Sequence, residues 1–248
     1  MQLIALNLSK KDCTYRGFIF ENKNMNFKID YKIVFFALFF CITKQIKYYI
    51  IIMLFASIHE FAHLITGVLM GFKPKKIGIM PVGLILSFKE NINNYNKKVL
   101  KGNMQCIKKI IVLFAGPLIN LLIVFIFIKI NINFKLIRKE EIIYSNMLIA
   151  IFNLLPIYPL DGGKIIKQIL HIFIGLKKSI KYILKISNIS LFFLDLILLI
   201  EILMSKNLAF IFIIIYLTTI VLIENKNLKM KYKIYVILEK NIAINKKK

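Results

Sequence analysis

A chain of 248 residues that is 58% hydrophobic and has a positive mean hydropathy is too apolar to be a soluble domain with a hydrated surface. In a soluble protein the formal charge of +24 would indicate nucleic-acid binding, but this composition predicts a membrane protein, and no nucleic-acid partner is expected. The three cysteines are widely separated and form no CxxC pair, so neither a disulfide framework nor a thiolate metal site is predicted.

The apolar segments predict an all-α membrane protein with about six transmembrane helices. A mostly apolar run of roughly 18 or more residues is long enough to cross a bilayer, and the first of the six segments is the shortest. The segments are, in chain order, 33–43, 48–70, 110–130, 143–160, 183–204 and 208–223.

The segments outside these helices differ in character. Residues 1–24 are polar and predict an N-terminal extension, which is expected either to be a disordered arm or to precede the true translation start at Met25. Residues 25–223 are predicted to form the six-helix core. After the second apolar segment, the stretch "PKKIGIMPVGLILSFKE" is β-branched and predicts a short β-hairpin or a membrane-skimming strand. Residues 224–248 form a basic tail.

The distribution of Lys and Arg predicts the orientation in the membrane. With six helices, alternate loops lie on the same side, and one set of segments carries 29 of the 36 Lys and Arg residues. That set comprises the N-terminal segment, residues 71–109, residues 161–185 and the tail. Since positive residues accumulate on the cytoplasmic side, we expect a multi-pass protein of the cell membrane with both termini in the cytoplasm.

The second apolar segment contains the HExxH motif His59-Glu60-Phe61-Ala62-His63. On a helix the two histidines lie one turn apart on the same face, as two imidazoles need to do to hold one Zn²⁺ ion. The glutamate lies where it can take a proton from a nearby water, so Glu60 is the expected general base. Polar residues are costly inside a membrane helix, which makes the motif more specific here than in a soluble chain.

A catalytic zinc site needs a third protein ligand and an open position for water. The candidates are His171, on a predicted cytoplasmic helix, and the acidic residues Asp161, Asp195 and Glu201. Asp161 follows the proline-containing sequence "LLPIYPL" and precedes two glycines, so its carboxylate lies where the backbone is expected to leave the helical conformation. We therefore predict that His59, His63 and Asp161 bind the metal.

Other polar residues in the apolar segments have competing interpretations. The histidines of a chance HExxH sequence would only form hydrogen bonds between helices, whereas Asp195 and Glu201 are expected to have structural roles in pairing with nearby polar residues. Asn120 and Asn153 either join neighbouring helices through hydrogen bonds or bind the substrate backbone.

Three motifs, each at an apolar segment, give the chain a family resemblance. The sequences HEFAH, FAGPLIN and NLLPIYPLDGG, in this order, resemble those of the site-2 protease family of intramembrane zinc proteases, and most closely its stage IV sporulation group. The resemblance implies that zinc is bound by His59, His63 and Asp161, with Glu60 as the base. It also implies a membrane-associated protein substrate, a pro-sigma factor in the sporulation group, and inhibitory membrane proteins as partners.

The chain departs from the sporulation group in one respect. Those proteases usually continue into a soluble CBS domain, whereas no CBS or PDZ domain is expected here, which puts ATP sensing in doubt. Three alternatives remain: a general site-2 protease that cleaves an anti-sigma factor or remnant signal peptides, an inactive family member, and a multi-pass metal or ion transporter. The intact Glu60 argues against inactivity, and the clustering of the polar residues argues against a transport pathway.

Overall fold

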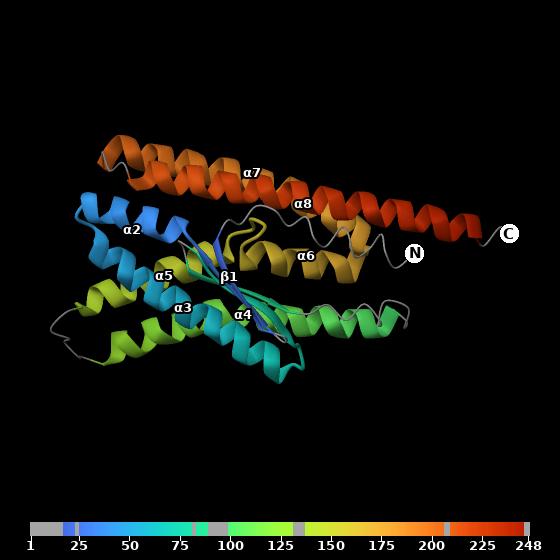
Figure 1. Ribbon diagram of the computed structural model, residues 1–248, viewed down its shortest axis with the longest axis horizontal. Helices are drawn as coiled ribbons and strands as arrows, with labels where there is room; N and C mark the ends of the chain where they lie inside the picture. The colour runs from blue at the N-terminus through green and yellow to red at the C-terminus, as the bar shows by residue number, and fades with distance from the viewer. Residues whose placement is uncertain are drawn as a thin grey trace. The chain divides into compact units, whose positions relative to one another are not determined.

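The computed structural model describes residues 17–22, 25–80, 83–88, 99–130, 137–205 and 209–245 (Figure 1). The chain divides into two compact units. The first contains Met1–Glu90 and Leu122–Asn146, and the second contains Asn91–Leu121 and Met147–Lys248. Helices α4 (Val99–Lys129) and α5 (Lys139–Leu154) therefore contribute residues to both units.

Three helices are long and apolar enough to cross a membrane. They are α3 (Ile46–Leu69), residues Asn103–Lys129 of α4, and residues Leu176–Met204 of α7 (Leu176–Ser205). Each of the six predicted segments overlaps a helix. Among the described residues, however, only these three helical segments have the length and composition of a membrane span. The prediction of a helical membrane protein is confirmed, and the number of spans stays a prediction beyond these three.

The other three predicted spans differ from expectation for local reasons. Helix α2 (Lys32–Ile42) is short, and α5 begins with charged residues and ends at Leu154, just before a stretch with two prolines. Helix α8 (Ala209–Asn245) continues beyond residue 223, where the predicted span ends. The lysine-rich sequence after that point contains no glycine or proline, and lysine is a good helix former, so the helix continues.

A four-stranded sheet in the first unit has the order β1-β2-β3-β4. Strand β3 (Pro74–Met80) pairs antiparallel with β4 (Gly83–Phe88) in the region where a hairpin was predicted, and the two linking residues lie outside the described ranges. Strands β1 (Gly17–Asn22) and β2 (Met25–Asp30) pair antiparallel, and β2 pairs parallel with β3. Residues Gly17–Asn22, which lie in the segment expected to be a disordered arm or to precede the translation start, therefore form a strand.

Strand β4 lies against α3 through the contact between Phe88 and Gly67. A Cβ atom added to Gly67 would come 2.1 Å from Cζ of Phe88, so with the ring in this position only glycine fits at this point of the helix. The ring centroid of Phe72, just after α3, lies 5.8 Å from that of Phe88. Since Gly67 comes one turn after His63, the contact holds β4 beside the HExxH helix.

Helices α7 and α8 of the second unit pack against each other. The buried residues Ile180 and Ile183 of α7 form a cluster with Leu228 of α8, and the Asn225 side-chain amide donates a hydrogen bond of 2.6 Å to Oδ1 of Asn188. Leu228 and Asn225 both lie in the segment predicted to be a tail. This segment is therefore part of the packed helical hairpin.

The start of α5 is joined to the start of α3 by the carboxylate of Glu141. Lys47 of α3 lies 2.8 Å from one oxygen of this carboxylate, and Arg138 donates to it from both its guanidinium group and its backbone N–H. The backbone bond closes the first turn of α5 as in a capping box. The hydrogen bond from Lys47, aided by those from Arg138, lowers the pKa of Glu141 against the opposing effect of desolvation.

We predict that Glu141→Gln lowers the Tm of the purified protein at neutral pH. Because the pKa of Glu141 is lower in the folded than in the unfolded state, its stabilisation is present above the unfolded pKa of about 4.3 and is lost as the pH falls through the folded pKa. The Tm difference from the wild type should therefore shrink in acid. Glu140→Gln, a change at the exposed neighbouring residue, is the control. Equal Tm losses for both variants, independent of pH, would contradict the prediction.

Candidate metal centre and active site

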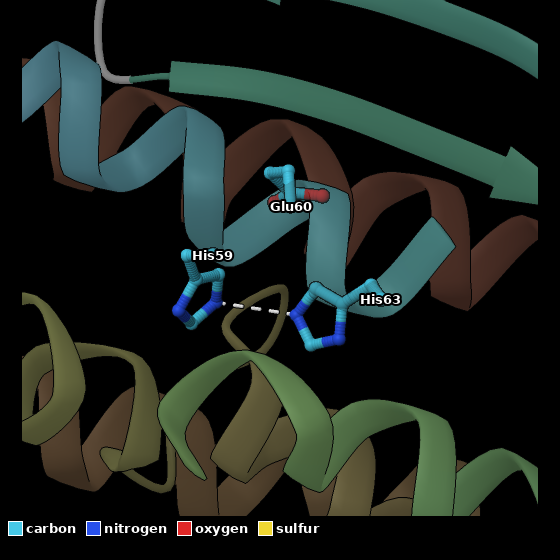
Figure 2. A group of neighbouring side chains, drawn as sticks. All are labelled: His59, Glu60 and His63. Atoms are coloured by element: carbon cyan, nitrogen blue, oxygen red, sulfur yellow. Dashed lines mark hydrogen bonds between the residues drawn. The ribbon is translucent and has the colours of Figure 1, made fainter. Parts of the chain in front are cut away.

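The two histidines of the motif turn their ring nitrogens toward each other on α3. Both are buried, with 2% and 5% of their surfaces exposed, and Nε2 of His59 lies 3.2 Å from Nε2 of His63. The ring centroids are 4.8 Å apart and the ring planes are nearly perpendicular, at 87°. Figure 2 shows the rings side by side on the same side of the helix. The sequence prediction that the histidines share one face is confirmed.

The separation of these nitrogens fits two ligands of one metal ion. Zinc bound to histidine has bonds of about 2.0–2.1 Å, and tetrahedral bond angles then separate two ligand nitrogens by about 3.3 Å. The observed 3.2 Å agrees with this separation. A hydrogen bond between the rings would also give this distance, with one nitrogen as donor and the other as acceptor. In both cases the two Nε2 atoms face the same point, as a metal site requires.

Glu60 lies between the histidines in sequence and is half-buried. It belongs with His59 and His63 to a group whose potential ligand atoms all lie within 4.8 Å of one another. A carboxylate at this distance can reach a water molecule near the two nitrogens, and a general base must be able to make that contact. The chemistry of the three side chains therefore fits a hydrolytic metal centre.

The second part of the predicted site is the break between α5 and α6 (Asp161–Ile174). Helix α5 ends at Leu154 and α6 begins at Asp161, so residues 155–160 leave the helical conformation, as the two prolines predicted. Polar backbone groups in an apolar environment need partners. The buried hydroxyl of Ser187 on α7 accepts a hydrogen bond of 2.8 Å from Tyr158 N–H and lies 3.3 Å from Tyr158 C=O, to which it can donate.

Two glycines allow α6 to begin close to the end of α5. A Cβ atom on Gly162 would lie 2.1 Å from the carbonyl oxygen of Leu154, and one on Gly163 would lie 2.5 Å from the carbonyl group of Ile157. Both obstacles are backbone atoms, which cannot rotate away as a side chain can. The glycines after Asp161 are therefore required by close packing of the backbone.

Asp161 is the first residue of α6 and is 4% exposed. Its carboxylate lies 3.3 Å from Nζ of Lys164 one turn later. A carboxylate at a helix N-terminus interacts favourably with the helix dipole. Asp161 belongs to the second compact unit and the histidines belong to the first, and its role as third ligand stays a prediction.

His171, the remaining histidine, contacts a cysteine of the same unit. Its Nδ1 lies 3.3 Å from Sγ of Cys106 on α4. Burial lowers the pKa of His171, and the nearby charges of Lys109 and Lys167 lower it further, so the ring is neutral at pH 7. The pairing with Cys106 was not predicted, because 65 residues separate the two side chains.

The other polar residues considered as candidates have different surroundings. Asn120 is fully buried, and neither polar atom of its side chain has a hydrogen-bond partner among the described residues. Asn153 donates to the carbonyl oxygen of Ile149 one turn earlier. Asp195 is half-buried and Glu201 is exposed. Of these residues, Asn120 is the one whose buried side-chain amide most requires a hydrogen-bond partner other than the described residues.

Solved structures assign the fold. The site-2 protease from Methanocaldococcus jannaschii superposes with a TM-score of 0.57 and 21% identity, covering 81% of this chain and 91% of that chain. The sequence pattern described as Peptidase family M50 matches residues 140–197, which include Asp161 and Ser187. The likeness shows the fold, and the HExxH motif adds a group of possible metal ligands on a helix long enough to span a membrane. The chain is thus similar to a site-2 protease in fold, and residues 140–197 are similar to Peptidase family M50.

Two curated relatives match about half of the chain. A zinc metalloprotease from Methanocaldococcus jannaschii is 32% identical over 139 residues, covering 52% of this chain and 37% of the relative. Stage IV sporulation protein FB from Bacillus subtilis is 27% identical over 128 residues, covering 50% of this chain and 41% of the relative. The matched segments thus span less than half of each relative's own length.

We predict that Ser187→Ala destabilises the protein by about 1–3 kcal/mol, since it leaves the N–H and C=O groups of Tyr158 without their partner. The loss should appear as a lower Tm, and with it lower proteolytic activity, because Asp161 follows three residues after Tyr158. Ser145→Ala is the matched control, since that equally buried hydroxyl makes only a local hydrogen bond to Glu141 C=O within α5. Equal effects of the two substitutions would show that Ser187 does not hold the break.

Proposed function

We propose that this protein is an intramembrane zinc metalloprotease that cleaves its substrate near the cytoplasmic face of the membrane. The observation that carries the proposal is the pair of buried histidine nitrogens 3.2 Å apart on a helix long enough to span a bilayer. Buried imidazoles facing each other in an apolar helix are costly unless they serve a purpose, and histidine is the commonest side-chain ligand of metal ions. The relative from Methanocaldococcus jannaschii named as a zinc metalloprotease supports the same activity.

In this proposal His59, His63 and Asp161 hold the Zn²⁺ ion. When bound, the ion would supply Lewis acidity to the scissile carbonyl group and acidify a water molecule. Glu60 takes the proton from the attacking water and passes it to the nitrogen of the leaving amine. Asp161 is favoured as the third ligand because it is buried at the start of α6 and lies within the residues matched by Peptidase family M50.

A transmembrane substrate must unwind before it is cut, since the carbonyl groups of a helix are already hydrogen-bonded and shielded. Among the described strands, β4 has a neighbour on one side only, so its other edge can accept an added strand of substrate. Asn120 is proposed to bind the substrate backbone, which is supported by its complete burial and its lack of a partner among the described residues. Asn153 already bonds within its helix, which favours a structural role.

We propose a multi-pass arrangement in the cell membrane with both termini in the cytoplasm, because the Lys and Arg residues concentrate in one set of segments. Asp161 lies next to one of these segments, so the cut is expected near the cytoplasmic edge of the bilayer. A soluble protein with a membrane-associated pro-segment fits this depth. The proposed substrate is therefore a pro-sigma factor activated during sporulation, which the similarity to stage IV sporulation protein FB supports. Inhibitory membrane proteins are proposed as further partners.

A second candidate function is that of a general site-2 protease, which cleaves an anti-sigma factor or remnant signal peptides. The higher identity to the Methanocaldococcus jannaschii relative, whose name specifies no sporulation role, favours this alternative. It uses the same metal centre and the same base. The two functions therefore differ only in the substrate.

Co-expression with the sporulation pro-sigma factor of the same genome tests the proposed function. The wild-type chain should shorten the pro-sigma factor, and Glu60→Gln should reduce the cleavage rate by about 100-fold or more, because the general base is lost. The variant should retain its zinc, since the ligands remain. Cleavage of a transmembrane anti-sigma factor instead of the pro-sigma factor would favour the second candidate. Unchanged cleavage by Glu60→Gln would remove Glu60 from the mechanism.

Metal analysis tests the third ligand. Asp161→Ala should lower both the zinc content and the activity of the purified protein, because two histidines alone bind zinc weakly. Asp195→Ala is the control, since Asp195 is the next candidate carboxylate. Normal zinc in Asp161→Ala together with reduced zinc in Asp195→Ala would transfer the role of third ligand to Asp195.

A further inference from the structure

The helical hairpin of α7 and α8 divides into an apolar half and a basic half. The apolar half comprises residues 189–204 of α7 and 209–223 of α8, and it exposes large side chains such as Phe192, Ile197 and Leu222. The basic half comprises residues 176–188 of α7 and 224–233 of α8. Asn188 and Asn225, joined by their hydrogen bond of 2.6 Å, lie at the boundary between the two halves.

The basic half carries eight lysines and only one acidic residue, Glu224. All but Lys177 are exposed at the surface. The lysines are Lys177, Lys178, Lys181 and Lys185 on α7, and Lys226, Lys229, Lys231 and Lys233 on α8. So many like charges close together repel one another, which disfavours the fold unless a partner of opposite charge binds them.

The packing of the two helices holds these lysines on a defined framework. The core cluster of Ile180, Ile183 and Leu228 lies within the basic half, and Tyr232 packs against it. The lysine-bearing backbone is thus ordered before any partner binds, so binding does not have to order it. This surface therefore differs from a flexible basic tail.

The distance from the boundary distinguishes a protein partner from the lipid headgroups. The headgroup layer of each leaflet is about 5–7 Å thick, whereas α8 rises about 12 Å from Asn225 to Lys233 at 1.5 Å per residue. Because α8 is one continuous helix, its basic half continues along the axis of its apolar half. In helices that stand upright at this boundary, lipid phosphates can meet Lys185 and Lys226, whereas the backbone of Lys181 and Lys233 lies beyond the headgroup layer.

Exposed apolar side chains lie among the lysines. Tyr182 is 53% exposed, and Met230 is 49% exposed. Above the headgroups these side chains have no lipid to contact, and apolar contacts interspersed with charge are typical of surfaces that bind protein segments. An acidic segment with some apolar residues would match both features of this surface.

We propose that the basic half of the α7–α8 hairpin is a docking surface for an acidic segment of a membrane-attached protein, held just above the headgroups. The inference rests on the proposed function in one respect: the partner is taken to be the substrate whose membrane-associated part is cut. Docking at this surface raises the local concentration of the substrate at the membrane without adding a contact at the metal centre.

Peptide binding to the full-length Glu60→Gln chain in nanodiscs of neutral phosphatidylcholine tests the proposal without requiring cleavage. A fluorescent glutamate-rich peptide should bind, and binding should weaken as salt is added. The triple variant Lys226→Gln/Lys229→Gln/Lys233→Gln should bind about tenfold more weakly, the combined effect of three exposed charge pairs. Glutamine has a helix propensity close to that of lysine, so α8 should stay folded.

The matched control is Lys44→Gln/Lys73→Gln/Lys129→Gln, which removes the same charge from exposed positions outside the basic half and should bind the peptide like the parent chain. Equal weakening in the two triple variants would overturn the proposal, since net charge alone would then explain binding. So would binding to anionic phosphatidylglycerol vesicles with none to the peptide, which would assign the surface to the membrane. Peptide binding without any proteolytic activity of the wild type would refute the proposed function and leave the docking surface standing.

Discussion

The free-energy cost of burying polar groups in apolar surroundings is the constraint on which the rest of this structure depends. An imidazole without a partner in such an environment is destabilising by an amount comparable with a lost hydrogen bond or more. Two rings one turn apart on α3 reduce this cost because each has the other's nitrogen within 3.2 Å. The arrangement is therefore stable enough to fold and is also preorganised for a shared ligand. Stability and chemistry at this position are consequences of the same spacing.

The same constraint governs the segment between α5 and α6. A chain that leaves the helical conformation among apolar helices exposes N–H and C=O groups that lack water, and these groups must find partners in the protein. Ser187 provides one hydroxyl for both groups of Tyr158, and Gly162 and Gly163 let the backbone of α6 approach the end of α5. Asp161 consequently starts its helix from a fixed point, which its proposed role as a metal ligand requires.

Local features of the chain could be predicted from the sequence, and features that depend on distant contacts could not. The HExxH face of α3 follows from helical periodicity, and the end of α5 follows from the chemistry of two prolines. The hydrogen bonds of Ser187 join residues 29 positions apart, and the ion pair of Lys47 with Glu141 joins residues 94 positions apart. No local sequence pattern predicts such contacts. Strand β1 had a weak signal in the short apolar run Phe18-Ile19-Phe20, which the polar residues before and after it obscured.

The contact between Gly67 and Phe88 favours one position of the strand β4 along α3, because the ring in its observed position fits only where the helix lacks a Cβ atom. A peptide paired with β4 presents alternate side chains to the same face, so its pairing can shift only in steps of two residues, or about 6.6–6.8 Å, without reversing that face. The allowed positions of an extended peptide bound at this edge would therefore differ by two residues relative to α3, the helix that carries the histidines. Selection of the scissile bond then becomes a matter of counting residues from a fixed pairing position rather than of recognising a particular side chain at the cut.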